Sequence, residues 1–247
     1  MGRIVWLVLC HSDDLAALWA YEGLKARGLA PLELVSAECL AFSLRLEHRV
    51  RSTETTFRIT LAGGRQLRSD QVFGALNRLQ AVPMPHWRWA TPKDREYVQQ
   101  EMAAFYLSWL YGLPGPVFNR ATAQGLSGAW RGPAEWRKLA VRAGLDALDY
   151  SSLEYSNKAE PRPWHAARQR LIAIEGVVSA REVPGEIAEG CGRLAELAQT
   201  PLLGLEFEVQ ADGTWRFAHA DCTPDLREGG VRFLDSLKDC LQNGARS

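Results

Sequence analysis

The chain has 247 residues, with 29 basic and 29 acidic side chains, so its formal net charge is zero. This balance argues against a general nucleic-acid or membrane-surface binder, because both need a surplus of positive charge on the domain. A hydrophobic fraction of 47% beside a charged fraction of 23% excludes wholesale disorder and predicts a sizeable core. The length fits one large domain or two small ones.

The sequence shows no pattern typical of a membrane or secreted protein. Its longest apolar run, Ile4 to Cys10, is too short to span a bilayer, and no small-residue cleavage site follows it. The five cysteines are odd in number and widely spaced, without a Cys-x-x-Cys pair. We therefore expect reduced thiols in a cytoplasmic protein with no membrane contact.

The first half of the chain predicts a mixed sheet with helices. Its apolar patterns indicate, in chain order, a strand over 3–10, a helix over 13–27, a strand over 32–35, a hairpin between 42 and 67, and a strand over 71–76. The β-α-β opening predicts a parallel strand pair with a right-handed crossover. Ser12 or Asp13 is expected to cap the first helix.

The second half predicts an antiparallel core. The expected elements are a helix over 91–112 with Thr91 as its N-cap, a helix over 133–143, a polar loop over 151–169, a strand over 170–179, a helix over 184–198, strands over 202–210 and 214–221, and a helix over 230–241. A Gly-rich stretch over 124–132 places the domain boundary, so we expect domains over 1–125 and 126–247.

The most informative side chains lie in the segment 202–224. If Asp212-Gly213 forms a two-residue turn, Glu206 lies directly across from His219, and Asp221 shares their face one diagonal step away. Two carboxylates and an imidazole can hold a divalent cation: the oxygens favour Mg²⁺ or Mn²⁺, and the imidazole allows Zn²⁺. A solvated face with a weak surface pair between Glu206 and His219 is the competing interpretation.

The opposite face of this hairpin is the one expected to be buried. Its residues are Leu203, Leu205, Phe207, Val209, Ala218 and Ala220. Cys222 is expected to point away from His219, so a Cys/His catalytic pair finds little support.

The same segment resembles the C-terminal core of the ATP-grasp superfamily. The shared pattern is LLGLEF, a short turn, a hydrophobic strand ending in xxD, two residues, and Pro-Asp-Leu. Carried over position by position, Glu206 matches the first acid of the family's hairpin, His219 matches its glutamate, and Asp221 matches its asparagine. In the family these side chains hold the Mg²⁺ of ATP, so the resemblance implies a metal site at the three positions.

Upstream segments resemble the linker region of the ATP-grasp ligases that modify peptides. These segments are Trp87-Arg88-Trp89, the helix around Glu101, Val117-Phe118-Asn119, and the Arg137–Leu145 helix. The β-α-β opening matches the smaller domain that precedes the grasp. The resemblance thus implies an α/β fold, in which a pre-ATP-grasp-like mixed sheet over 1–125 is followed by a reduced ATP-grasp-like α+β core over 126–247.

Two departures from the family alter the functional expectation. Family members carry a long two-lobed insert whose lysines bind the ATP phosphates, whereas here only the loop around 146–169 is available, with Lys158 as its sole lysine. The imidazole of His219 also suits Mg²⁺ poorly. We therefore expect a degenerate module without catalytic residues of its own, which binds either no cofactor or Mg²⁺ and ATP weakly. Its expected role is to bind a peptide or partner protein in a peptide-modification or biosynthetic pathway.

A partner surface is predicted from an arginine-rich stretch and a tryptophan pair. Residues 45–68 hold six arginines and one histidine against two acids. Arg49 and Arg51 in this stretch, with Trp87, Arg88 and Trp89 in an expected loop, are the candidate contacts for an acidic peptide or partner protein. The competing interpretation is an exposed hairpin face with no partner.

Two other functions stay open at this point. The first is an active ATP- and Mg-dependent carboxylate–amine ligase, with the metal on the hairpin. The second is a metal-dependent hydrolase using His11, Asp13 and Asp14, because this motif after the first strand resembles the zinc motif of PIG-L-type deacetylases. Helix capping by Ser12 or Asp13 competes with that metal role.

Overall fold

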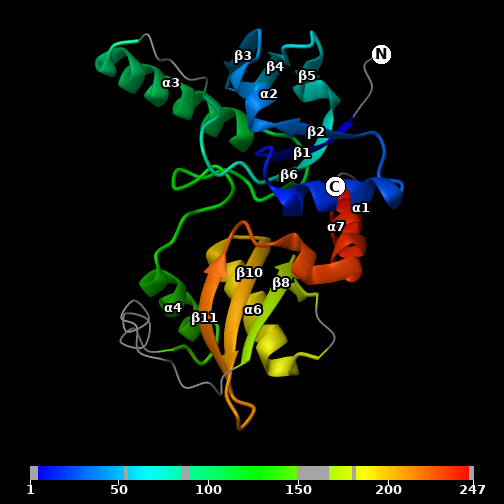
Figure 1. The fold of residues 1–247 in the computed structure, drawn as a ribbon, viewed down its shortest axis with the longest axis vertical. Coiled ribbons are helices and arrows are strands. Elements are labelled where there is room, and N and C mark those ends of the chain that lie inside the picture. The colour runs from blue at the N-terminus through cyan, green and yellow to red at the C-terminus, as the bar shows by residue number, and fades with distance from the viewer. Residues whose placement is uncertain (1–4, 53–54, 85–89, 149–166, 180–181, 245–247) are drawn as a thin grey trace. The chain divides into compact units, whose positions relative to one another are not determined.

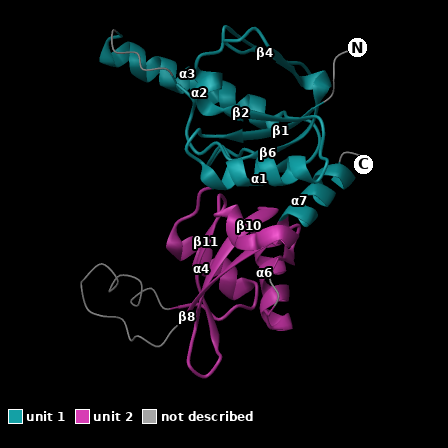
Figure 2. Cartoon of the chain, turned by 45° about the vertical axis from the view of Figure 1, so that its right-hand side comes forward, with its two compact units in different colours: residues 1–129, 234–247 teal, residues 130–233 magenta. Residues whose placement is uncertain are grey.

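The computed structural model describes residues 5–52, 55–84, 90–148, 167–179 and 182–244 (Figure 1). The chain forms two compact units, residues 1–129 together with 234–247, and residues 130–233 (Figure 2). The two units are defined by which residues pack together. The expected domains 1–125 and 126–247 stay a prediction.

A parallel sheet lies at the centre of the first unit. Its strands are β1 (Val5–Cys10), β2 (Leu32–Ser36), β6 (Val72–Asn77) and β7 (Val117–Phe118), in the order β2-β1-β6-β7. All three strand pairs are parallel, which confirms the predicted β-α-β opening. Every residue of β1 is buried, as expected for a central strand of such a sheet. The winding direction reverses between β1 and β6, the position where open α/β sheets bind ligands.

Helix α1 (Leu15–Ala26) follows β1, and α7 (Gly230–Gly244) lies beside it (Figures 1 and 2). The Nε of Arg27 donates to the Asp235 Oδ1 at 2.6 Å, and the Lys238 Nζ donates to the Arg27 carbonyl at 2.8 Å. A Cβ at Gly23 would lie 2.4 Å from the Leu234 Cδ1, so the two helices touch because residue 23 has no side chain. These contacts place the end of α7 in the first unit.

The N-cap of α1 is Asp14, so the expected cap at Ser12 or Asp13 is wrong. The Oδ1 of Asp14 accepts from the backbone N–H of Ala17 at 2.9 Å. The Asp14 N–H donates to the His11 carbonyl at 3.1 Å, and this turn delays the start of the helix.

A second sheet in this unit is antiparallel. It consists of β3 (Arg45–Val50), β4 (Thr55–Thr60) and β5 (Gln66–Arg68), with α2 (Ala37–Ala41) before it and the 3-10 turn η1 (Ser69–Gln71) after it. Its inner face packs against α3 (Pro92–Tyr111), where the ring of Phe57 lies 5.7 Å from that of Trp109. Thr91 and Gly112 cap α3 as predicted.

The second unit is an antiparallel sheet with helices packed on it. Its strands are β8 (Ala167–Ile174), β9 (Val177–Val178), β10 (Leu202–Val209) and β11 (Trp215–Asp221), in the order β11-β10-β8-β9. Helices α4 (Pro133–Arg142) and α6 (Gly185–Ala198) share one hydrophobic cluster with β8, β10 and β11, and the 3-10 turn η3 (Leu226–Gly229) follows β11.

The expected single strand over 170–179 is wrong, because β8 turns back into β9 at Glu175 and Gly176. Both residues have positive φ, 47° and 76°, as the tightest hairpin turns require. A glutamate rarely adopts this conformation, so residue 175 did not indicate a turn.

Two findings concern the other expectations from composition. No helix in the described ranges is long and apolar enough to cross a membrane. None of the five cysteines, all of which lie in the described ranges, forms a disulfide bond.

Candidate functional site

The β10–β11 hairpin places Glu206 directly across from His219, as predicted. The loop and the strand pairing that produce this register differ from the expected two-residue turn. The Gln210 N–H donates to the Thr214 carbonyl, which leaves a three-residue loop closed by Gly213 at φ 84°. The register then shifts by one residue on the His219 side of Phe217. The longer loop and this bulge compensate, so the pair forms although the expected two-residue turn is absent.

The bulge changes which residues of β11 face the core. Phe217 and Ala220 are buried in the cluster with α4 and α6, whereas Ala218 is only half-buried, so its expected place in the core is wrong. His219 stays exposed. The predicted buried face is therefore confirmed for Leu203, Leu205 and Phe207 on β10 and for Ala220 at the end of β11. Val209 is only half-buried, so its expected place in the core is wrong as well.

Two arginines on β8 hold the carboxylate of Glu206. The Arg168 Nη1 lies 2.8 Å from the Glu206 Oε1, and the Arg170 Nε lies 3.8 Å from Oε2. The Arg170 Nη1 also donates to the Glu228 Oε1 at 2.8 Å. That hydrogen bond, together with the charges of Glu228 and Glu206, raises the pKa of Arg170 above its usual value. The sequence did not reveal these partners, because residue 168 was expected to lie in a loop.

Asp221 shapes the turn that follows β11. Its Oδ1 accepts from the Thr223 N–H at 2.8 Å and from the Thr223 hydroxyl at 3.2 Å. The turn brings Pro224 onto Gly204, where a Cβ would lie 2.5 Å from the Pro224 Cβ. Glycine at position 204 is therefore what allows the turn to close over the sheet.

These residues line a pocket of about 230 Å³ on the polar face of the sheet. The lining residues are Arg170, Leu171, Gly204, Leu205, Glu206, His219, Ala220, Asp221, Pro224, Asp225 and Glu228. The structure thus brings Glu206, His219 and Asp221 to one pocket. Within the described residues, however, no three His, Cys, Asp or Glu side chains are arranged to hold a metal ion. Arg168 takes up one carboxylate and Thr223 another, and metal binding at the three positions stays a prediction.

Cys222 does not join this pocket. It packs against the hydrophobic cluster under α4 and α6, on the side predicted for it. Burial, followed by the charge of Asp221, raises the pKa of the Cys222 thiol to about 11. A thiol with this pKa is a poor nucleophile near neutral pH.

The carboxyl ends of β1 and β6 carry the second group of candidate residues. Asp14 caps α1 and also pairs with Arg78, whose Nε lies 2.7 Å from Oδ2. The Ser12 hydroxyl donates to the Glu38 Oε1 at 3.0 Å. His11 and Asp13 do not join Asp14 in a metal-ligating group within the described part of the chain. Asp14 thus has a structural role, and a metal at His11, Asp13 and Asp14 stays a prediction.

An internal polar network supports the same strand ends. The Nδ2 of Asn77, on β6, donates to the carbonyls of Asn119 and Leu126 at 2.9 and 2.7 Å. Burial, followed by the charge of Asp14, raises the pKa of the adjacent Cys10 thiol to about 12. The Asn77 amide thus fixes the loops at the strand ends, and the raised pKa makes the Cys10 thiol a poor nucleophile near neutral pH.

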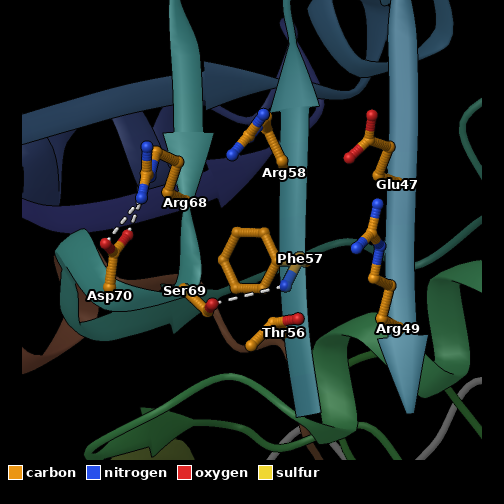
Figure 3. A pocket seen from close by; sticks show the side chains of 8 residues that line it. All are labelled: Glu47, Arg49, Thr56, Phe57, Arg58, Arg68, Ser69 and Asp70. Carbon is orange, nitrogen blue, oxygen red and sulfur yellow. Dashed lines mark hydrogen bonds and ion pairs between the residues drawn. The ribbon is translucent and has the colours of Figure 1, made fainter.

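The arginine-rich stretch forms the exposed face of the β3–β4–β5 sheet. A second pocket, of about 310 Å³, lies on this face (Figure 3). Arg49 lines it, whereas Arg51 lies beyond the end of β3 and does not. The other predicted partner residues, Trp87, Arg88 and Trp89, lie outside the described residues. The sequence did not single out Arg58 and Arg68, which the structure places beside each other in this pocket.

Comparisons with known proteins identify the fold. No protein-family model matches the chain, and no curated protein sequence matches it. Among solved structures, the chain is similar to the macrocyclase MdnB from Microcystis aeruginosa MRC, with a TM-score of 0.66 at 15% identity over 96% of this chain and 98% of that one. The macrocyclase MdnC from the same organism, bound with precursor peptide MdnA, gives a TM-score of 0.71 at 11% identity over 99% and 100% of the two chains.

A third solved structure agrees. The ATP-grasp ligase PsnB, complexed with a minimal precursor, gives a TM-score of 0.64 at 16% identity over 98% of this chain and 100% of that one. At these identities the similarity establishes the fold and not the activity. The predicted α/β class and the resemblance to ATP-grasp proteins are confirmed: the chain has an ATP-grasp-like fold.

Proposed function

We propose that this chain, which has an ATP-grasp-like fold, is a noncatalytic protein that binds a peptide or partner protein within a peptide-modification pathway. The observation that carries the proposal is the guanidinium of Arg168, 2.8 Å from the carboxylate of Glu206. The resemblance places a Mg²⁺ ion at this carboxylate. A guanidinium supplies positive charge there, but unlike a metal ion it has no open coordination position for a phosphate oxygen.

The two other hairpin residues fit the same proposal. His219 presents an imidazole where the resemblance places a glutamate, and an imidazole is a poor ligand for Mg²⁺. The Asp221 Oδ1 already accepts two hydrogen bonds from Thr223. The hairpin thus keeps its local shape through protein contacts, and the fold is retained for binding rather than for ATP chemistry.

A peptide is the partner that the structural neighbours favour. MdnC was solved with precursor peptide MdnA, and PsnB with a minimal precursor, so two proteins of this fold bind peptides. We extend this to the present chain, with Arg49, Arg51, Trp87, Arg88 and Trp89 as contact residues in a cytoplasmic setting. A nucleic-acid partner is disfavoured by the zero net charge.

The test compares Mn²⁺ binding, followed by electron paramagnetic resonance, in the wild type and in Arg168→Gln. Removing the guanidinium leaves Glu206 with only the longer contact to Arg170, so we expect Mn²⁺ affinity to rise by about tenfold, the change that 1.4 kcal/mol produces. Arg142→Gln, which removes an arginine on α4 in the same unit, is the matched control and should leave the affinity unchanged. Strong Mn²⁺ binding in the wild type, unaffected by Arg168→Gln, would mean that the arginine does not replace the metal.

An active carboxylate–amine ligase is the second candidate. The observation in its favour is the pocket of about 230 Å³, which keeps Glu206, His219 and Asp221 together. A working ligase binds ATP with Mg²⁺ and loses that binding in Asp221→Ala. Calorimetry of both proteins separates this candidate from the noncatalytic one.

A further inference from the structure

We infer that the pocket on the exposed face of the β3–β4–β5 sheet docks an acidic segment of a peptide and binds one of its carboxylates between Arg49 and Arg58. The inference rests on the proposed function, since it supposes a peptide partner, and it adds the surface and the chemistry of recognition. Figure 3 shows the pocket residues on three neighbouring strands and on the turn after β5.

The charges of the pocket leave room for one carboxylate. The lining residues are Glu47, Arg49, Thr56, Phe57, Arg58, Arg68, Ser69 and Asp70. Three arginines and two carboxylates give this set one uncompensated positive charge. A single aspartate or glutamate side chain of a partner neutralises it.

Two of the three guanidinium groups are available to a ligand. Arg68 is held by Asp70, with its Nε and Nη2 donating to the two carboxylate oxygens at 2.9 and 2.8 Å. The carboxylate of Glu47 is paired with Arg45. Arg49 and Arg58 form no ion pair or hydrogen bond through their side chains within the described residues. Both can therefore donate to an incoming carboxylate, for which the planar guanidinium is well matched.

The strand register provides a second argument that an anion binds here. Arg58 on β4 lies directly opposite Arg68 on β5. Two like charges directly opposite each other on a sheet are unfavourable, so this pair does not help the fold. Asp70 compensates Arg68, and its charge also acts on Arg58. An anion bound beside Arg58 would relieve the repulsion that remains between the two arginines.

The acids of the pocket favour a peptide over a chain of phosphates. Glu47 lies directly opposite Arg58 on one side, and Asp70 holds Arg68 on the other. A nucleic acid carries a negative charge at every nucleotide, so it would bring phosphates against one of these carboxylates. An extended peptide presents side chains alternately, and it can place one acid between the arginines with a neutral residue on either side.

The test uses a short fluorescein-labelled peptide with glutamate at alternate positions, and the same peptide with glutamine in their place. Fluorescence anisotropy measures its binding to the wild type, to Arg58→Gln and to Arg95→Gln. Arg95 is an exposed arginine on α3, in the same unit but outside the pocket lining, so its replacement removes an equal charge as a matched control. We expect Arg58→Gln and the glutamine peptide each to weaken binding by about tenfold, and Arg95→Gln to change it less than about threefold.

Weaker binding in a variant can also result from misfolding, so a second variant is chosen that should bind more tightly. Asp70→Asn frees Arg68 and adds one positive charge to the pocket, so the glutamate peptide should bind several-fold more tightly. Equal binding of both peptides, an unchanged Kd in Arg58→Gln, or weaker binding in Asp70→Asn would each overturn the site. So would no binding of the glutamate peptide at millimolar protein, or equal competition by a single-stranded oligonucleotide.

The same samples separate this inference from the proposed function. ADP release from ATP is measured in the presence of each peptide. Turnover of ATP would overturn the noncatalytic function while leaving the acidic-peptide site intact. Binding of the two peptides with equal affinity and without ATP turnover would overturn the acidic-peptide site and leave the noncatalytic function intact.

Discussion

Replacing Asp14 with alanine removes two interactions at once, the N-cap of α1 and the ion pair with Arg78. The cap hydrogen bond to Ala17 is 2.9 Å long, and losing such a cap costs about 1 kcal/mol. The ion pair is largely buried, since the side chains of Arg78 and Asp14 are 4% and 14% exposed. Removing one partner of a buried pair costs about 3–5 kcal/mol. We therefore expect Asp14→Ala to lower the free energy of unfolding by about 4–6 kcal/mol.

Two companion variants resolve the two contributions. Asp14→Asn can keep the cap and loses the charge, so it should be less destabilised than Asp14→Ala by about 1 kcal/mol. Asp13→Ala changes the exposed neighbour and should stay within about 0.5 kcal/mol of the wild type. Urea unfolding followed by tryptophan fluorescence measures all three. If Asp14→Ala loses less than about 1 kcal/mol, or if Asp13→Ala loses as much, the structural role assigned to Asp14 is wrong.

Three further predictions concern a half-buried imidazole, a glycine and a thiol. Burial lowers the pKa of His48 below its unfolded value of about 6.5, so its contribution to stability is present above that pH and is lost as the pH falls toward the folded pKa. Thermal melting between pH 8 and pH 5 should show a smaller decline in His48→Phe than in the wild type, and equal declines would contradict this. Gly204→Ala should lower the free energy of unfolding by about 1–3 kcal/mol because its Cβ would meet Pro224, whereas Gly185→Ala, with open space around its Cβ, should not. Iodoacetamide at pH 8 should label the exposed Cys39 well before Cys222, whose raised pKa keeps it protonated; mass spectrometry showing the opposite order would refute that assignment.

The sequence predicted correctly those features that depend on residues close to one another in the chain. Thr91, Pro92 and Gly112 mark the ends of α3 because capping depends on residues within one turn of the helix end. The pairing of Glu206 with His219 was also predicted, but through two errors of opposite sign. The loop holds one more residue than expected, and the bulge beside Ala218 restores the register. A bulge of this kind leaves no mark in the alternation of a short strand.

The arginines of the candidate site could not be predicted in the same way. Arg168 meets Glu206 because β8 pairs with β10 across a long stretch of sequence. The first four residues of β8 are all exposed, so they show no alternation, and the sequence indicated a loop there. Similarly, Arg58 and Arg68 become neighbours only through the register of β4 and β5. Which charges meet depends on strand pairing, which composition and spacing do not determine.

Calorimetric titration of ATP with Mg²⁺ into the purified protein, repeated with Asp221→Ala, tests the central claim most directly. With Arg168 and Arg170 at the Glu206 carboxylate, the account predicts no saturable heat at millimolar ATP in either protein. Saturable binding to the wild type that disappears in Asp221→Ala would contradict it, because the hairpin would then hold the metal and nucleotide of a working ligase.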